Sequence, residues 1–357
     1  MNAATATIRN EQWDVIRGIG IICVVLGHCM PFTIGVHFIF LFHMGLFFFI
    51  SGYFLKKEKS ENINTLGKFT TRKLQTLYVP FLLLNFCVLL IQNWCVSWHM
   101  AEVSYHGVDL IKMVLKIFLF CPVDNPLLSQ IWFLRSLFIS QMIVYVIINF
   151  IHSTRIRTII ISFFAITGWL LSYYGVKLPF NMTQNLVICS IIYLGYFIKH
   201  TERCDATSKQ RIGGGTSLTI MSLMILYISA HYIAIDINNS NMSYLGAVQL
   251  CTLVGICFCF GLSRIIMKQR LLKNIFSYLG KNSLYIFLLH IIAFKTVSAL
   301  IVYVYSLPWD APSKNLYNQI VEDNMGENWW MAYTFAGLSL PLCIVYVKNK
   351  VKEMIKI

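Results

Sequence analysis

Residues 14–28 read D-V-I-R-G-I-G-I-I-C-V-V-L-G-H, and residues 37–54 read H-F-I-F-L-F-H-M-G-L-F-F-F-I-S-G-Y-F. Both stretches are apolar enough to enter a lipid bilayer, yet the first carries Arg17 and His28 and the second carries His43. A single buried histidine commonly just satisfies a neighbouring polar group. An ionisable side chain inside a membrane is costly, however, and by default it marks a pathway or a reaction centre. Three such groups on one predicted hairpin therefore indicate a functional site.

The composition of the whole chain predicts a polytopic membrane protein. Of its 357 residues, 57% are hydrophobic and only 12% are charged, which is not the composition of a soluble domain. A membrane span needs about 20 mostly apolar residues. Ten such stretches are predicted, at 15–32, 37–55, 76–96, 130–151, 157–175, 183–199, 216–235, 244–262, 283–305 and 330–347. We therefore expect an all-α bundle of about ten transmembrane helices that forms one domain over residues 1–357.

The distribution of lysine and arginine predicts how this bundle is oriented. The basic residues concentrate in every second loop, at 56–73, 155–157, 199–211, 264–281 and 348–356, whereas the alternate loops are poor in them. Basic loops stay in the cytoplasm, so both termini are expected there. The net charge of +14 is spread over loops and follows no groove or helix face, so we expect no nucleic-acid partner. The first span is expected to be a retained helix, because no small-residue cleavage site follows it.

Eleven cysteines lie mostly inside apolar runs, with no C-x-x-C pair and no histidine–cysteine set at zinc spacing. They are predicted to be small apolar core residues, and no metal site is expected. Cys95 and Cys121 flank one long loop and could form a disulfide. That loop, 97–129, and a second at 306–329 are expected on the outer side. Each could be a lid or acceptor platform or, equally, an interfacial aromatic belt with surface helices.

The rise of a helix brings the ionisable groups of the first two spans together. At about 1.5 Å per residue, Arg17 is predicted within one turn of the cytoplasm and His28 roughly 20 Å deep. The second span enters from the outside and places His43 roughly 10 Å below the outer boundary by the same rise. His28 and His43 are therefore expected at one level of the membrane.

Two later spans bring further ionisable groups to a similar depth. His290 lies near the middle of its span, while Arg135 and Lys295 lie closer to an end and could instead extend toward water. No aspartate or glutamate falls in the middle of any predicted span, which counts against an ion-driven transporter. A neutral histidine can act as a general base, and nearby cations or hydrogen-bond donors can stabilise an oxyanion. This set of groups is typical of acyl transfer.

Basic residues also precede the third predicted span, which begins near Pro80. Lys68, Arg72 and Lys73 stand at what would be the cytoplasmic end of the bundle. Fixed positive charges there suit a phosphorylated donor. The alternative is that these residues only keep the loop in the cytoplasm.

Five sequence features together resemble the acyltransferase 3 family of integral-membrane acyltransferases, including the sugar O-acetylases and the fucose 4-O-acetylase-like group. These are Asp14 with Arg17-x10-His28, the run F-H-M-G-L-F-F-F-I-S-G-Y, the stretch R-K-L-Q-T-L-Y-V-P, the segment I-W-F-L-R-S-L-F and the segment S-L-Y-I-F-L-L-H. They occur in the family's order between residues 14 and 290. The Arg-x10-His pattern combined with F-F-F-I-S-G-Y is the most specific of them.

The resemblance implies an enzyme of the bacterial inner membrane that takes an acyl group, commonly acetyl, from cytoplasmic acyl-CoA. The acceptor would be a hydroxyl of an envelope polysaccharide or a lipid-linked sugar, with no permanently bound cofactor. His28 and Arg17 are the predicted catalytic residues, and Arg72 and Lys73 stand where relatives often carry R-x-R. Donor binding is predicted for Arg72, Lys73 and Lys68, and substrate binding for Asp14, His43, Trp132, Arg135 and His290. Direct transfer and an acyl-histidine relay both fit these residues. A polysaccharide exporter or flippase is the alternative function.

Overall fold

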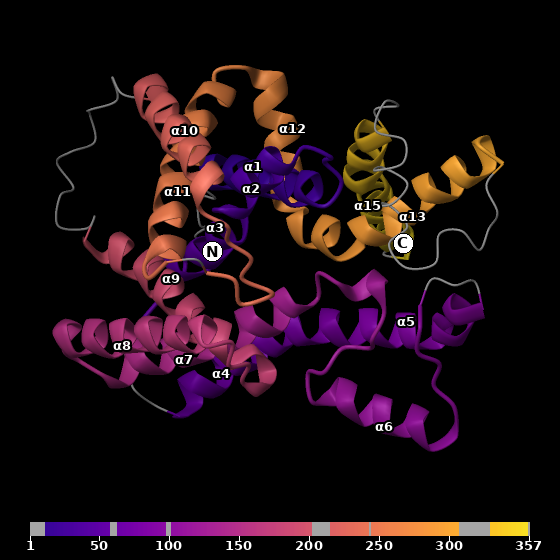
Figure 1. Ribbon diagram of the computed structural model, residues 1–357, viewed down its shortest axis with the longest axis horizontal. Helices are drawn as coiled ribbons and strands as arrows, with labels where there is room; N and C mark the ends of the chain where they lie inside the picture. The colour runs from indigo at the N-terminus through magenta and orange to yellow at the C-terminus, as the bar shows by residue number, and fades with distance from the viewer. Residues whose placement is uncertain are drawn as a thin grey trace, which may run out of the picture.

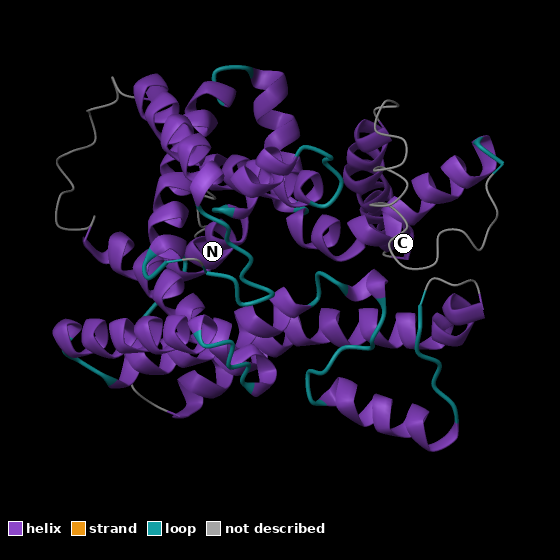
Figure 2. Cartoon of the chain, viewed as in Figure 1, coloured by secondary structure: helices purple, strands orange, loops and turns teal. Residues whose placement is uncertain are grey.

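The computed structural model describes residues 11–57, 63–97, 101–201, 215–242, 244–306 and 329–355. These residues form helices joined by short loops (Figure 2), and the one β-type pairing among them is an isolated bridge between Asp236 and Asn241. The predicted all-α membrane bundle is therefore confirmed. The ten-residue N-terminus, part of the basic loop at 199–211 and nearly all of the loop at 306–329 lie outside the described residues.

A helix corresponds to each of the ten predicted spans (Figure 1). The helices that match the predicted bounds closely are α7 (Trp132–Phe150), α8 (Thr154–Tyr173), α9 (Met182–Thr201), α10 (Gly215–Tyr232), α11 (Ala247–Ile266) and α13 (Ser283–Val304). Helix α1 (Glu11–Gly27) ends before the predicted end at residue 32, and α15 (Trp329–Ile355) continues past the predicted end at residue 347. Within the described ranges, eight helices are long and apolar enough to cross a membrane. The other two are shorter: α1 has 17 residues, and the apolar part of α10 is Thr216–Tyr232.

The second predicted span is not continuous. It consists of α2 (Thr33–Phe40) and α3 (His43–Tyr53), and the backbone between them leaves the helical conformation at Phe42, with φ −141° and ψ −22°. The imidazole of His43 bridges this break, because its Nδ1 lies 2.9 Å from the carbonyl oxygen of Ile39. The span predicted at 37–55 is confirmed as the apolar segment Thr33–Tyr53, but its helix is interrupted, and the break places His43 at a helix start.

The third predicted span begins earlier than expected. Helices α4 (Ile63–Lys73) and α5 (Val79–Ser97) are joined without interruption by a π-helical turn, η1 (Leu74–Tyr78). The turn precedes Pro80, which has no N–H to donate and whose ring would crowd the preceding turn of an α-helix. Arg72 and Lys73 therefore lie on a helix and not in a loop as predicted.

Two amphipathic helices occupy segments that were predicted as loops. Helix α6 (Gly107–Phe118) lies in the 97–129 segment beside α5 (Figure 1). It exposes Val108, Ile111 and Leu115 on one face. Such a helix suits the membrane–water interface, as the surface-helix alternative proposed. Helix α12 (Arg270–Lys281) precedes α13. Cys95 and Cys121 are both free thiols, so the suggested disulfide is not formed.

Helix α12 holds α1 at backbone contact distance. A Cβ atom built on Gly280 would lie 1.8 Å from the carbonyl oxygen of Asp14, and one built on Gly18 would lie 2.1 Å from that of Phe276. Close backbone approach through glycine is a common way for helices to pack in membranes. An ion pair of 3.0 Å between Lys273 and Glu11 also joins the two helices. The position of α1, which leads to His28, is therefore fixed by α12.

Candidate functional site

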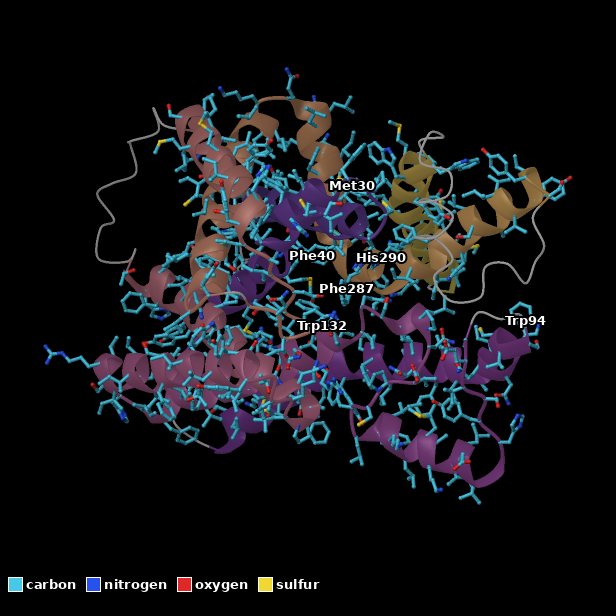
Figure 3. The ribbon with its side chains drawn as sticks, viewed as in Figure 1. Met30, Phe40, Trp94, Trp132, Phe287 and His290 are labelled. Atoms are coloured by element: carbon cyan, nitrogen blue, oxygen red, sulfur yellow. The ribbon has the colours of Figure 1, made fainter. Side chains whose placement is uncertain are left out.

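A cavity of about 360 Å³ opens between the end of α1, the α2–α3 break, the start of α7 and helix α13. We call it the histidine cavity. Its lining residues are His28, Phe40, His43, Met44, Ser129, Gln130, Trp132, Phe287 and the loop residues 235–239. Figure 3 shows Phe40, Trp132, Phe287 and His290 gathered near the middle of the molecule. The two histidines expected at one level of the membrane thus line one cavity.

His28 follows directly after α1, which ends at Gly27. Its ring centroid lies 5.3 Å from that of His290 and 6.4 Å from that of Phe40. Among the described residues, none hydrogen-bonds to the His28 ring. A half-buried imidazole of this kind can exchange a proton with a bound molecule.

The protonation of the other two histidines is fixed by their neighbours. Nδ1 of His290 lies 2.8 Å from the carbonyl oxygen of Phe287 and 3.1 Å from that of Ile286, and Nδ1 of His43 faces the carbonyl of Ile39. A carbonyl oxygen only accepts, so Nδ1 carries the hydrogen in both rings and Nε2 is left as the acceptor when the ring is neutral. In the fully buried His290, Nε2 has no partner within the described part of the chain.

Polar residues that the sequence did not single out also line the histidine cavity. Asp236, in the loop between α10 and α11, accepts hydrogen bonds from the backbone N–H of Asn239 at 3.2 Å and from its side-chain amide at 2.7 Å. The buried Gln130 donates from Nε2 to the carbonyl oxygen of Leu288 at 2.9 Å. This bond fixes the amide orientation, and Oε1 has no described partner. The sequence signal for Gln130 was one uncharged polar residue before an apolar run, which is too weak to use.

A second cavity, of about 430 Å³, contains two of the three basic residues of the predicted donor site. We call it the arginine cavity. Arg17, Arg72 and Lys73 line it, together with apolar residues of α1, α3, the π turn, α7 and α13. Arg17 forms a 3.1 Å ion pair with the fully buried Asp14 and lies 5.1 Å above the ring of Phe54. Three cations from two distant segments of the chain therefore meet at one cavity.

The two cavities are adjacent and share one lining residue. Phe287 is the one residue that lines both of them. Two adjacent residues at the start of α7 line different cavities. Trp132 lines the histidine cavity, and Phe133 lines the arginine cavity. The chain therefore has a cationic cavity and a histidine-lined cavity that meet at the side chain of Phe287.

Four predicted site residues lie outside the walls of both cavities. Arg135 donates to the carbonyl oxygen of Phe120 at 3.2 Å and to Oδ1 of Asn181 at 2.8 Å, so it ties α7 to the loop after α6 and to the 3-10 helix η3 (Pro179–Asn181). Asp14 is the ion-pair partner of Arg17, and the His290 ring is next to the His28 ring. Lys68 is exposed on α4.

The arrangement supplies the groups that acyl transfer to a hydroxyl requires. One cavity offers fixed cations for an anionic donor. The other offers a base and hydrogen-bonding groups for an acceptor. The described part of the chain holds no group of three or more histidine, cysteine, aspartate or glutamate residues placed to bind a metal ion.

Comparison with known proteins gives a match to one protein family. No curated protein and no solved structure matches the chain. The sequence model of the acyltransferase 3 family, described as an acyltransferase domain, matches residues 10–348, which is nearly the whole chain. The chain therefore belongs to this family of membrane acyltransferases.

Proposed function

We propose that this protein transfers an acyl group, most simply acetyl, from acyl-CoA to a hydroxyl of a cell-envelope glycan or a lipid-linked sugar. The enzyme works in the bacterial inner membrane, with both termini and the arginine cavity toward the cytoplasm. The observation that carries the proposal is the contact between the cationic cavity and the histidine-lined cavity at Phe287. Two substrates can then react without either of them crossing the whole membrane.

The donor occupies the arginine cavity. Arg72, Lys73 and Arg17 bind the phosphates of CoA at its mouth, since guanidinium and ammonium groups form strong charge-assisted hydrogen bonds with phosphate. The rest of the lining, which is mostly apolar, receives the pantetheine arm and the thioester. The Phe69 ring, 5.6 Å from the guanidinium carbon of Arg72 and 5.3 Å from Nζ of Lys73, keeps the two cations side by side.

The acceptor hydroxyl enters the histidine cavity. His28 takes its proton as the oxygen attacks the thioester carbonyl, a C–O bond forms, and the C–S bond breaks. The proton then passes from His28 to the departing CoA thiolate. Gln130 and Asp236 accept hydrogen bonds from other hydroxyls of the sugar, and His43 and Trp132 complete the binding surface. General base catalysis of this kind contributes roughly 10²- to 10⁴-fold to the rate.

The test is purified protein incubated with radiolabelled acetyl-CoA and envelope fractions of a host that lacks the gene. Wild-type protein should form an alkali-labile ester on the glycan, and His28→Ala should lower the rate by about 10²-fold or more while inserting normally. Near wild-type ester formation by His28→Ala would mean that the histidine is structural.

Deletion of the gene separates this function from polysaccharide export. A transferase leaves the glycan on the surface without its ester. Loss of the surface glycan with intact acylation inside the cell would favour the exporter instead.

A further inference from the structure

We propose that Phe287 is the gate between the two cavities and that it limits the enzyme to short acyl groups. This inference rests on the proposed transfer from acyl-CoA. It assigns the choice of acyl chain to one side chain of α13.

The position of Phe287 places it on the path of the acyl group. Its side chain is 6% exposed and lines both the arginine cavity and the histidine cavity. His290 is one helical turn further along α13, and the ring centroids of the two residues are 6.3 Å apart. His290 in turn lies 5.3 Å from His28. An acyl group that reaches His28 from the arginine cavity must therefore pass the Phe287 ring.

The surrounding aromatic residues hold this ring in place. The Phe287 ring packs 5.1 Å from that of Phe133, which itself lies 4.8 Å from Phe48 and 6.3 Å from Phe47. Phe47 and Phe133 line the arginine cavity, and Phe48 is fully buried. Close-packed aromatic residues have little room to rotate, so the Phe287 ring cannot move aside freely.

Because the acyl group enters tail first, the fixed position of the Phe287 ring limits the length of the acyl chain. The acyl tail is the leading end of the donor, and the carbonyl carbon follows it. All carbons of the tail must therefore lie beyond Phe287 before the carbonyl can meet an acceptor hydroxyl beside His28. An acetyl group places one methyl there, whereas a longer chain displaces either the aromatic ring or the acceptor.

The experiment compares acyl-CoA donors of different length on the purified full-length protein. Acetyl-, propionyl-, butyryl- and hexanoyl-CoA are offered separately with envelope fractions of the gene-deleted host, and the esters are identified by mass spectrometry. The variants are Phe287→Ala and Phe287→Leu. The matched control is Phe294→Ala, because Phe294 is fully buried on the same helix, lies 5.6 Å from His290 and lines neither cavity.

The expected result is that wild-type protein uses acetyl-CoA in preference to butyryl-CoA. Phe287→Ala should raise the ratio of kcat/KM for butyryl-CoA to that for acetyl-CoA by about tenfold or more, the discrimination that methylene-sized differences give in apolar pockets. Phe287→Leu should shift the ratio in the same direction by less, and Phe294→Ala should leave it unchanged.

Several results overturn the gate. These are an unchanged ratio in Phe287→Ala, an equal shift in Phe294→Ala, or wild-type protein that uses hexanoyl-CoA as well as acetyl-CoA. If Phe287→Ala does not accumulate, an unchanged ratio in Phe287→Leu overturns it as well. Ester formation by wild-type protein with an unchanged ratio in the variants removes the gate alone, whereas no ester from any donor removes the proposed function too.

Discussion

Replacement of Gly280 by alanine tests whether α12 holds α1, and with it the reacting groups, in position. The added Cβ would lie 1.8 Å from the carbonyl oxygen of Asp14 and 2.9 Å from the backbone nitrogen of Gly18. Both neighbours are backbone atoms and cannot rotate away. The two helices must therefore separate by more than about 1 Å, and overpacking of this kind destabilises a protein by about 1–3 kcal/mol or more.

The same displacement reaches the site, because α1 carries Arg17 and leads to His28. A misplacement of about 1 Å in a catalytic arrangement can lower the rate by about 10²-fold. We expect Gly280→Ala to lower both the temperature of thermal unfolding in detergent and the rate of ester formation. The matched control is Gly67→Ala on α4, where no atom lies within 4 Å of the added Cβ. The control should be neutral, or more stable by about 1 kcal/mol from the better helix propensity of alanine.

The result that refutes this reasoning is a Gly280→Ala protein with wild-type unfolding temperature and wild-type activity. Equal losses in Gly280→Ala and Gly67→Ala would also refute it, because the effect would then not depend on the contact between α1 and α12.

Three further predictions concern the substrates and the orientation. Replacement of Arg72 and Lys73 by glutamine should raise KM for acyl-CoA by about tenfold or more without loss of membrane insertion, since charge-assisted contacts to phosphate are lost; an unchanged KM would contradict donor binding there. Gln130→Leu should raise KM for the acceptor more than KM for acetyl-CoA, because the amide lines only the histidine cavity; equal changes would contradict its place in the acceptor site. A cysteine introduced at Lys57 should not react with an impermeant reagent added outside intact cells, as the cytoplasmic location of basic loops requires, and labelling there would reverse the predicted orientation.

The sequence predicted the helices whose apolar residues are continuous and missed the irregular positions between and within them. The break at Leu41–Phe42 contains neither proline nor glycine, so nothing in the sequence distinguishes it from helix. Helices α6 and α12 have 12 residues each and are apolar on one face only, so a search for uniformly apolar spans reads them as loops. Pro80 was taken as a helix start, because a π turn that accommodates it leaves no mark in the sequence.

The residues of the candidate site also fall into those that the sequence could identify and those that it could not. His28, His43 and Arg17 could be recognised because charge-bearing side chains are rare in apolar spans. Asp236 could not, since an aspartate in a polar loop is ordinary until the fold brings the loop to the cavity. Phe287 is one of 26 phenylalanines, and only its place between two cavities distinguishes it.

The π turn at Leu74–Tyr78 has a consequence for how the length of this segment can vary. Successive residues of an α-helix are rotated by about 100° around its axis. The π turn holds one residue more than the same stretch of a regular α-helix would, because its N–H groups bond to carbonyl oxygens five residues earlier and not four. A deletion of one residue within the turn would therefore let α4 and α5 continue as one regular α-helix, with Arg72 and Lys73 still facing the arginine cavity. A deletion of one residue elsewhere in α4 or α5 has no such turn to absorb it, and it would rotate the residues before it by about 100° relative to those after it. A change in length by one residue is therefore expected to be tolerated within Leu74–Tyr78 and not in the regular helix on either side.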